Sequence, residues 1–393
     1  MNDSAPTVSV IIPTYNRPEL LRRAVESVLQ QTFRDLEVII VDEGSCEETY
    51  LSNAKTSHLD NRVRYVYKKE NRGPAAARND GIRMASGRYV AFLDDDDVWL
   101  SEKLEKQVQF MSSYEDLEAV CCDFGFIDTN GKILNRDNGI GRRLKSARKL
   151  FKCYSGRESW YRIGRQALYK IALVHYVFYL VSTAIVKRQF LVNVGLFDES
   201  LPTNEDWDLL IRLVLCCNFG YLDEVLCYAR GHDVRYSQSR LSNNTKLMLL
   251  GHFMLLDKLD REVPDRFRHY LHAHAYQRYS SIIHFYLVRC DFSAAESIIH
   301  RFNQKFGLLA ARRLMIELLP PIIASCLMER DFSAPESTIY RITQKNALLV
   351  TRHLMIKLYV RIITGCLTEQ DFSATEPIIY RLNQKYGLVG CFT

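Results

Sequence analysis

The sequence predicts an α/β fold over its first 240 residues, with a mostly parallel sheet flanked by helices, and a wholly helical region after it. Two observations support this prediction. Apolar strand-like runs alternate with helical segments through the first hundred residues, and only helical spacing is present beyond residue 240. Because alternating strands and helices need crossover connections, neighbouring strands become parallel. We therefore expect two domains, residues 1–240 and 241–393.

The predicted strands are short apolar runs that end in polar or glycine-containing segments. The first four are Val8–Ile12, Leu36–Val41, Val63–Tyr67 and Arg88–Leu93, and two more lie near Ala119–Asp123 and at Leu180–Val186. Helices are predicted at Glu19–Gln31 and Pro74–Ala85, from Glu102, and from Glu205.

Polar clusters follow three of these strands. They are Pro13-Thr14-Tyr15-Asn16, the segment that begins with Asp42, and the run Asp94–Asp97. Ligands of open α/β sheets bind beyond the carboxyl ends of the strands. The sequence therefore predicts that the three clusters meet at one binding crevice.

Composition places this chain among soluble globular proteins, with 47% hydrophobic and 25% charged residues. The excess positive charge lies in residues 241–393, with 19 basic and 13 acidic side chains, against 33 of each in 1–240. This favours a solvated basic face or contact with an anionic membrane surface over a nucleic-acid site.

The cysteines and the N-terminus indicate a compartment. The 11 cysteines form no C-x-x-C pair, and the adjacent pairs Cys121-Cys122 and Cys216-Cys217 lie in apolar runs, which suits a reducing cytoplasm. No signal peptide is recognised, and the longest apolar stretch, Ile171–Val186, is too short to span a bilayer comfortably. We expect a cytoplasmic protein, with a peripheral position at the inner face of the membrane as an option.

The helical region repeats itself with a period of 40 residues. Copies begin at Asp291, Asp331 and Asp371, and 291–330 and 331–370 share 22 of 40 residues. Each copy starts with a Ser-x-x-Glu capping box. Stacked helical hairpins are predicted, with the third copy, 371–393, truncated.

Four consecutive aspartates, Asp94 to Asp97, have two interpretations. They form a solvated loop with Asp97 as a helix N-cap, or they hold a hard divalent ion such as Mg²⁺ or Mn²⁺ together with phosphate oxygens. Carboxylates two residues apart point the same way in extended backbone. Their position after a buried strand favours the metal, and a diphosphate–metal substrate would explain the run.

Other polar residues keep two interpretations each. Arg78, on an alanine-rich helix, binds a phosphate or carboxylate, or neutralises Asp80 or Asp42. Asp42 accepts a hydrogen bond from a sugar hydroxyl or a base N–H of a ligand, or only from the backbone of its own turn. Glu205-Asp206 complements the helix dipole or supplies a general base. The remaining candidate is His232, a loop histidine or a phosphate or metal contact.

Together these motifs resemble family 2 glycosyltransferases with the GT-A fold. The segments that carry the resemblance, over about residues 7–240, are Val8–Asn16, Val38–Ser45, Asn71–Gly81, Asp94-x-Asp96-Asp97, Gly195–Asp198 and Glu205–Leu209. Glu43 stands where a second aspartate is common, and Asp95 occupies the middle of the D-x-D motif. The extra carboxylate leaves the metal ligand open among Asp94, Asp95 and Asp96.

The resemblance implies an inverting enzyme that moves a sugar from a nucleoside-diphosphate donor, with a UDP-sugar favoured, in the presence of Mn²⁺ or Mg²⁺. Pro13–Asn16, Asp42 and Arg78 would contact the nucleotide, and Asp94 would meet its ribose or the metal. Asp96 would bind the metal. Asp206 would be the general base, with Glu205 beside it.

The function predicted from the sequence is thus a metal-dependent hexosyltransferase that acts on a glycan or lipid-linked acceptor in polysaccharide or glycoconjugate synthesis. The alternative is a catalytically inactive protein that binds sugar nucleotide and acts as a scaffold through its helical repeats. Nucleotidyl transfer is less favoured because no glycine-rich phosphate loop with a lysine is present. A membrane or protein partner for the repeats remains an expectation.

Overall fold

The computed structural model describes residues 5–56, 60–128, 131–135, 151–153, 159–174, 180–230, 245–288, 292–307 and 310. It comprises two compact units, Met1–Leu271 and His272–Thr393. Helix α10 (Thr245–Glu262) lies within the first unit. The domain division at residue 240 stays a prediction.

Strands of the first unit form one mixed sheet, in the order β3-β2-β1-β4-β10-β6-β11-β9-β8, with β5 paired to β11 and β7 to β6. The first four are β1 (Val8–Thr14), β2 (Leu36–Glu43), β3 (Val63–Lys68) and β4 (Tyr89–Phe92). The others are β5 (Val98–Trp99), β6 (Ala119–Ile127), β7 (Ile133–Asn135), β8 (Phe151–Cys153), β9 (Trp160–Ile163), β10 (Ala184–Lys187) and β11 (Phe219–Arg230).

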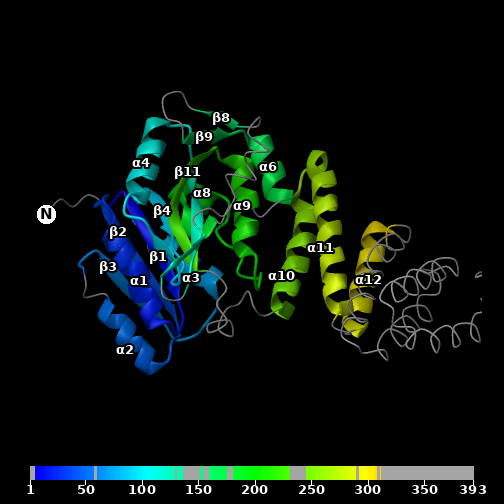
Figure 1. Ribbon diagram of the computed structural model, residues 1–393, viewed down its shortest axis with the longest axis horizontal. Helices are drawn as coiled ribbons and strands as arrows, with labels where there is room; N and C mark the ends of the chain where they lie inside the picture. Colours follow the sequence, from blue (N-terminus) through cyan, green and yellow to red (C-terminus); the bar gives the residue numbers. More distant parts are fainter. Residues whose placement is uncertain are drawn as a thin grey trace, which may run out of the picture. The chain divides into compact units, whose positions relative to one another are not determined.

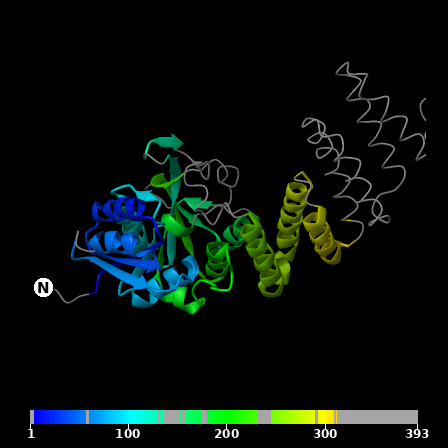
Figure 2. The same ribbon diagram turned by 90° about the horizontal axis from the view of Figure 1, so that it is seen from below.

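The parallel part of the sheet, β3-β2-β1-β4, is the part that the sequence predicted most directly. Every residue of β1 and β4 is buried, as expected for parallel strands covered on both faces. The strands from β10 onward include antiparallel pairs, among them β10 with β4 and with β6. Figure 1 and Figure 2 show the first strands and their connecting helices, drawn blue to cyan, as one contiguous body. The α/β prediction is confirmed.

The helices of the first unit connect the strands. They are α1 (Pro18–Leu29), α2 (Glu47–Thr56), α3 (Pro74–Met84), α4 (Lys103–Ser113), α6 (Arg165–Val174), α7 (Leu180–Thr183), α8 (Arg188–Asn193), α9 (Glu205–Cys216) and α10. Helix α3 packs closely against the sheet. A Cβ added at Gly81 would lie 2.4 Å from Cγ2 of Ile11 in β1. The small residues Ala75, Ala76 and Ala77 are buried in the same helix.

One predicted strand begins later than the sequence indicated. The run Leu180–Val186 starts as the short helical turn α7, and β10 begins only at Ala184. Ser182 interrupts the run with a left-handed backbone, φ 66°, which a strand residue does not adopt. The correction has a local cause, because this bend brings the Ser182 carbonyl to the indole of Trp99, whose Nε1 donates to it at 2.7 Å.

Beyond residue 240 the described elements are helical. They are α10, the 3₁₀ turn Asp265–Phe267, α11 (Arg268–Val288) and α12 (Phe292–Phe306). No helix of the described ranges is both long and apolar enough to cross a bilayer. Apart from the start of the first copy, the 40-residue repeats lie outside the described residues.

Packing of α3 on β1 gives a test of the fold. Gly81→Ala should lower the free energy of unfolding by roughly 1–3 kcal/mol, because the new methyl group overlaps Ile11. Urea denaturation measures the change. Gly164→Ala is the matched control, since no atom lies within 4 Å of its added Cβ. Equal midpoints for the two variants would contradict this account of the α3–β1 contact.

Candidate active site

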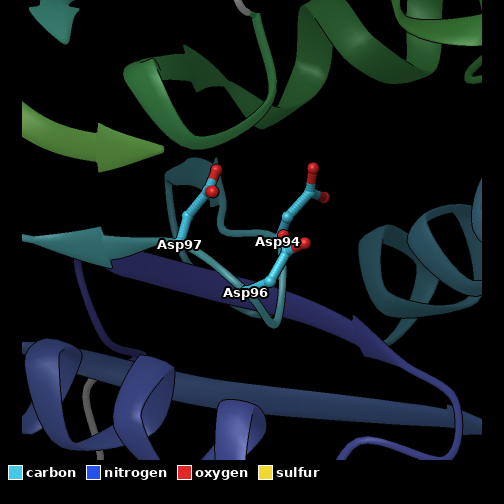
Figure 3. A group of neighbouring side chains, drawn as sticks. All are labelled: Asp94, Asp96 and Asp97. Atoms are coloured by element: carbon cyan, nitrogen blue, oxygen red, sulfur yellow. The ribbon is translucent and has the colours of Figure 1, made fainter. Parts of the chain in front are cut away.

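The four aspartates follow β4 as a tight turn, in which the amide of Asp97 donates to the carbonyl of Asp94 at 3.0 Å. The turn brings one carboxylate oxygen from each of Asp94, Asp96 and Asp97 within 4.8 Å of one another. Figure 3 shows these three side chains on the loop. The alternative of Asp97 as a helix N-cap is wrong, because β5 follows it and α4 starts only at Lys103.

Asp95, the inserted carboxylate, makes different contacts from its neighbours. It accepts a hydrogen bond from Thr14 Oγ1 at 2.8 Å and pairs with Arg17 Nη1 at 3.1 Å. Burial raises the pKa of Asp95 to about 7, although the charge of Arg17 opposes this shift. Both of its oxygens are therefore engaged with the end of β1 and the start of α1.

Asp97 is one of the three aspartates that could together hold a metal ion. It is buried, its Oδ1 accepts from the amide of Arg230, and its Oδ2 has no hydrogen-bond partner. Burial, and then the charges of Asp96 and Asp94, raise the pKa of Asp97 well above its usual range. An unpaired buried carboxylate oxygen beside two other carboxylates is the donor set that Mg²⁺ or Mn²⁺ prefers.

Arg78 links the two acidic clusters. From α3, its Nη2 pairs with Asp94 Oδ1 at 2.8 Å and its Nη1 with Glu205 Oε1 at 2.7 Å. Burial alone would lower the pKa of Arg78, but the charges of Asp94 and Glu205 outweigh it and the pKa is raised. Neither Asp80 nor Asp42 is its partner: Asp80 pairs with Lys68, Arg72 and Arg83.

Glu205 and Asp206 open α9, as predicted, after Asn204 in a left-handed conformation with φ 65°. Glu205 is buried and neutralised by Arg78, whereas Asp206 is half-buried and accepts from the amide of Trp207 at 2.8 Å. The charge of Asp206 also acts on Arg78. Carboxylates more than a hundred positions apart in the chain thus meet around one guanidinium.

The predicted nucleotide residues lie at the ends of β1 and β2. Pro13 and Thr14 are buried in β1, Tyr15 is 47% exposed, and Asn16 has a left-handed backbone with φ 54°. The Asn16 amide donates to Ser45 Oγ at 2.8 Å, and its Oδ1 accepts from the Cys46 amide at 2.9 Å. These reciprocal bonds fix the two strand ends to each other.

Asp42 is fully buried and accepts three hydrogen bonds, from the Ser45 amide, Asn53 Nδ2 and the Tyr65 hydroxyl at 2.6 Å. Burial, and then the hydrogen bond to Asp42, raise the pKa of Tyr65. The contacts of Asp42 therefore include the bond within its own turn that the sequence suggested. Binding of a nucleotide by Asp42 stays a prediction. His232 lies outside the described residues.

Three residues of this region were missed from the sequence. Arg17 pairs with Asp95 and approaches Asp96 Oδ2 at 3.6 Å, Ser182 Oγ accepts from the Asp94 amide at 3.1 Å, and Arg230 Nε donates to the Asp96 carbonyl at 3.3 Å. Arg17 directly follows the Pro-Thr-Tyr-Asn segment, which is a signal that could have identified it. Arg230 lies two residues before the candidate His232, whereas nothing in the local sequence indicated Ser182.

The chain also has a cavity of about 440 Å³ that is distant from these groups. It lies at the amino ends of β1 and β4, and its lining includes Arg88, Lys187 and Arg188. The acidic clusters lie at the carboxyl ends of the same strands. Because the buried, charged and strained residues gather at the carboxyl ends, we place the candidate active site there and not at the cavity.

The Arg78 bridge gives a direct test. Arg78→Met should cost about 3–5 kcal/mol of unfolding free energy, because it leaves buried Glu205 and half-buried Asp94 without their cation. Thermal or urea unfolding measures the loss. Arg83→Met on the same helix, where the side chain is 55% exposed, should change it by less than about 0.5 kcal/mol. Similar losses in both variants would show that the bridge is not what stabilises the site.

Part of this chain is similar to a known protein family. Residues 9–178 match the family described as "Glycosyl transferase family 2". A Rickettsia felis protein described as an uncharacterized glycosyltransferase is 26% identical over 264 residues, which cover 67% of this chain and 40% of that protein. TuaG of Bacillus subtilis, described as a "Putative teichuronic acid biosynthesis glycosyltransferase", is 46% identical over 111 residues, or 28% of this chain and 44% of TuaG.

Solved structures share the fold at low sequence identity. Residues 1–349 of S. aureus TarS superpose with a TM-score of 0.53 at 18% identity, covering 86% of this chain and 92% of that one. The mannosyltransferase PcManGT from Pyrobaculum calidifontis, solved with GDP-Man and Mn²⁺, gives 0.50 at 20% identity, with 88% of each chain covered. These neighbours support the GT-A-like fold. Residues 9–178 are thus similar to glycosyltransferase family 2, and the match covers less than half of the chain.

Proposed function

We propose that this protein is a metal-dependent inverting glycosyltransferase that moves a hexose from a nucleoside-diphosphate sugar, with a UDP-sugar favoured, to a hydroxyl of a glycan or lipid-linked acceptor. The observation that carries the proposal is the Arg78 bridge, which holds the Asp94–Asp97 turn and the Glu205-Asp206 pair at one site. The name of TuaG supports a role in polysaccharide or glycoconjugate synthesis.

In this proposal Asp94, Asp96 and Asp97 hold Mn²⁺ or Mg²⁺, and Asp95 braces the turn through Thr14 and Arg17. When bound, the cation would offset negative charge on the departing diphosphate as a Lewis acid. The sequence left the metal ligand open among Asp94, Asp95 and Asp96. The proposal omits Asp95, whose oxygens bind Thr14 and Arg17, and adds Asp97, whose Oδ2 has no hydrogen-bond partner.

Asp206 is the better candidate for the general base. Glu205 is buried and bound by Arg78, so proton uptake there would break an ion pair. Asp206 is more exposed, on the first turn of the same helix. It would accept the proton of the acceptor hydroxyl while that oxygen attacks the anomeric carbon from the face opposite the diphosphate. Pro13–Asn16, Asp42 and His232 would contact the nucleotide.

A peripheral position at the inner face of the membrane fits a lipid-linked acceptor and remains part of the proposal, with the C-terminal helices as the candidate contact. The alternative function is a catalytically inactive scaffold that binds sugar nucleotide and acts through its helical repeats. Metal-dependent nucleotide binding distinguishes the two.

Metal binding is the first test. Isothermal titration of UDP should show higher affinity with Mn²⁺ than without it. Asp96→Ala and Asp97→Asn should each weaken Mn²⁺ binding by more than about tenfold, because each removes a candidate ligand. Asp95→Asn should weaken it less, because Asp95 faces Thr14 and Arg17. A larger effect of Asp95→Asn would reverse the assignment, and metal-independent UDP binding would favour the scaffold.

The base is tested by transfer kinetics. Asp206→Asn should lower kcat by about 10²–10⁴-fold, because the amide cannot take the hydroxyl proton. UDP affinity in the presence of Mn²⁺ should stay at the wild-type value. A panel of sugar nucleotides, screened first for Mn²⁺-dependent hydrolysis, identifies the donor for this assay. If Asp206→Asn kept most of its turnover, another group would be the base.

A further inference from the structure

Helix α10 contributes no residue to the candidate site, yet it packs directly on the turn that leads into α9. Thr203 Oγ1 donates to the carbonyl of Leu247 at 3.4 Å. A Cβ added at Gly251, one turn along α10, would lie 2.1 Å from Thr203 Oγ1 and 2.8 Å from the Thr203 carbonyl oxygen. The turn therefore rests on the backbone of α10, and only glycine leaves room for it.

The same turn contains a backbone conformation that needs support. Asn204 has φ 65°, a left-handed conformation that costs free energy for a residue other than glycine. Its side-chain Nδ2 donates to Thr203 Oγ1 at 3.0 Å and lies 3.2 Å from Nδ1 of His252 on α10. The His252 ring also meets the ring of Trp207 edge-on, with centroids 5.9 Å apart.

A third contact lies two turns further along α10. Lys258 Nζ is 2.8 Å from Asp208 Oδ1 in the first turn of α9 and 2.7 Å from Asp198 Oδ2. The Asp208 side chain is fully buried, so this ion pair is shielded from solvent. Leu247, Gly251 and Lys258 are four and seven residues apart, which places them on one face of the helix.

We propose that α10 is the positioning element of the candidate general base, with Gly251 as the residue on which this depends. By holding Thr203, Asn204 and Asp208, α10 fixes where Glu205 and Asp206 stand relative to the Asp94–Asp97 turn. The inference rests on the proposed function for its kinetic consequence. It also places part of the region beyond residue 240 within the working glycosyltransferase, although the family match ends at residue 178.

Gly251→Ala in the full chain tests this. The added methyl displaces Thr203 and with it the start of α9, so kcat should fall by about 100-fold, while KM for the sugar nucleotide and Mn²⁺ affinity stay at wild-type values. Leu250→Ala on the same helix, where the side chain is 50% exposed, is the matched control and should keep wild-type kcat. Thr203→Ala combined with Gly251→Ala removes the 2.1 Å contact and should recover part of the loss.

A second readout does not depend on activity. Amide hydrogen exchange of residues 204–209 should be faster in Gly251→Ala than in wild type, and unchanged in Leu250→Ala. His252→Ala, which removes a contact without adding bulk, should change kcat and exchange in the same directions, and it decides the question if Gly251→Ala does not fold. Wild-type exchange at 204–209 in Gly251→Ala, or in His252→Ala in that case, overturns the inference. If the wild-type protein transfers no sugar but exchange at residues 204–209 is still faster in Gly251→Ala, α10 supports this turn and the proposed function is rejected.

Discussion

The site depends on one buried cation. Arg78 is 5% exposed and holds carboxylates that follow it by 16 and by 127 positions in the chain. A guanidinium suits this role because its planar fork donates to two carboxylates at once and it stays charged when buried. Removing such a cation is costly, since two carboxylates would remain in a poorly solvated region. The distance between the Asp94–Asp97 turn and α9 is therefore set by the length of one side chain.

The fold explains why Arg78 can reach both partners. Helix α3 packs closely on β1 at Gly81, and the residues just before Arg78 are small buried alanines. The Arg78 side chain therefore begins in the protein interior. The neighbouring Asn79 bonds the amide and carbonyl of Phe197, which leads toward α9. Local sequence thus controls a long-range contact. The small residues around Arg78 allow α3 to pack closely on β1, and this packing positions the Arg78 side chain between Asp94 and Glu205.

The sequence was a good guide to the parallel half of the sheet and a poorer one to the rest. Parallel strands are buried on both faces and appear as uninterrupted apolar runs, which is how β1, β2 and β4 were recognised. The run 180–186 looks the same but holds Ser182 in a left-handed turn, because contacts to Asp94 and Trp99 fix its backbone. Tertiary contacts of this kind leave no mark on local periodicity. The roles of Asp95 and Asp97 were hidden for the same reason, since a turn and not an extended segment decides where each carboxylate points.

The charge balance of the site shows what the aspartate run requires. Six carboxylates, those of Asp94–Asp97, Glu205 and Asp206, lie near three guanidiniums, those of Arg17, Arg78 and Arg230. If every one of these carboxylates were ionised, negative charge would exceed positive charge among the described side chains of the site, and burial with this crowding raises the pKa of Asp95 and of Asp97. The three cations also differ in position: Arg17 and Arg78 bind Asp95 and Asp94, whereas Asp97 Oδ2 has no hydrogen-bond donor. Positive charge is therefore most needed at the point where Asp94, Asp96 and Asp97 converge, and a hard divalent ion supplies it without a further side chain.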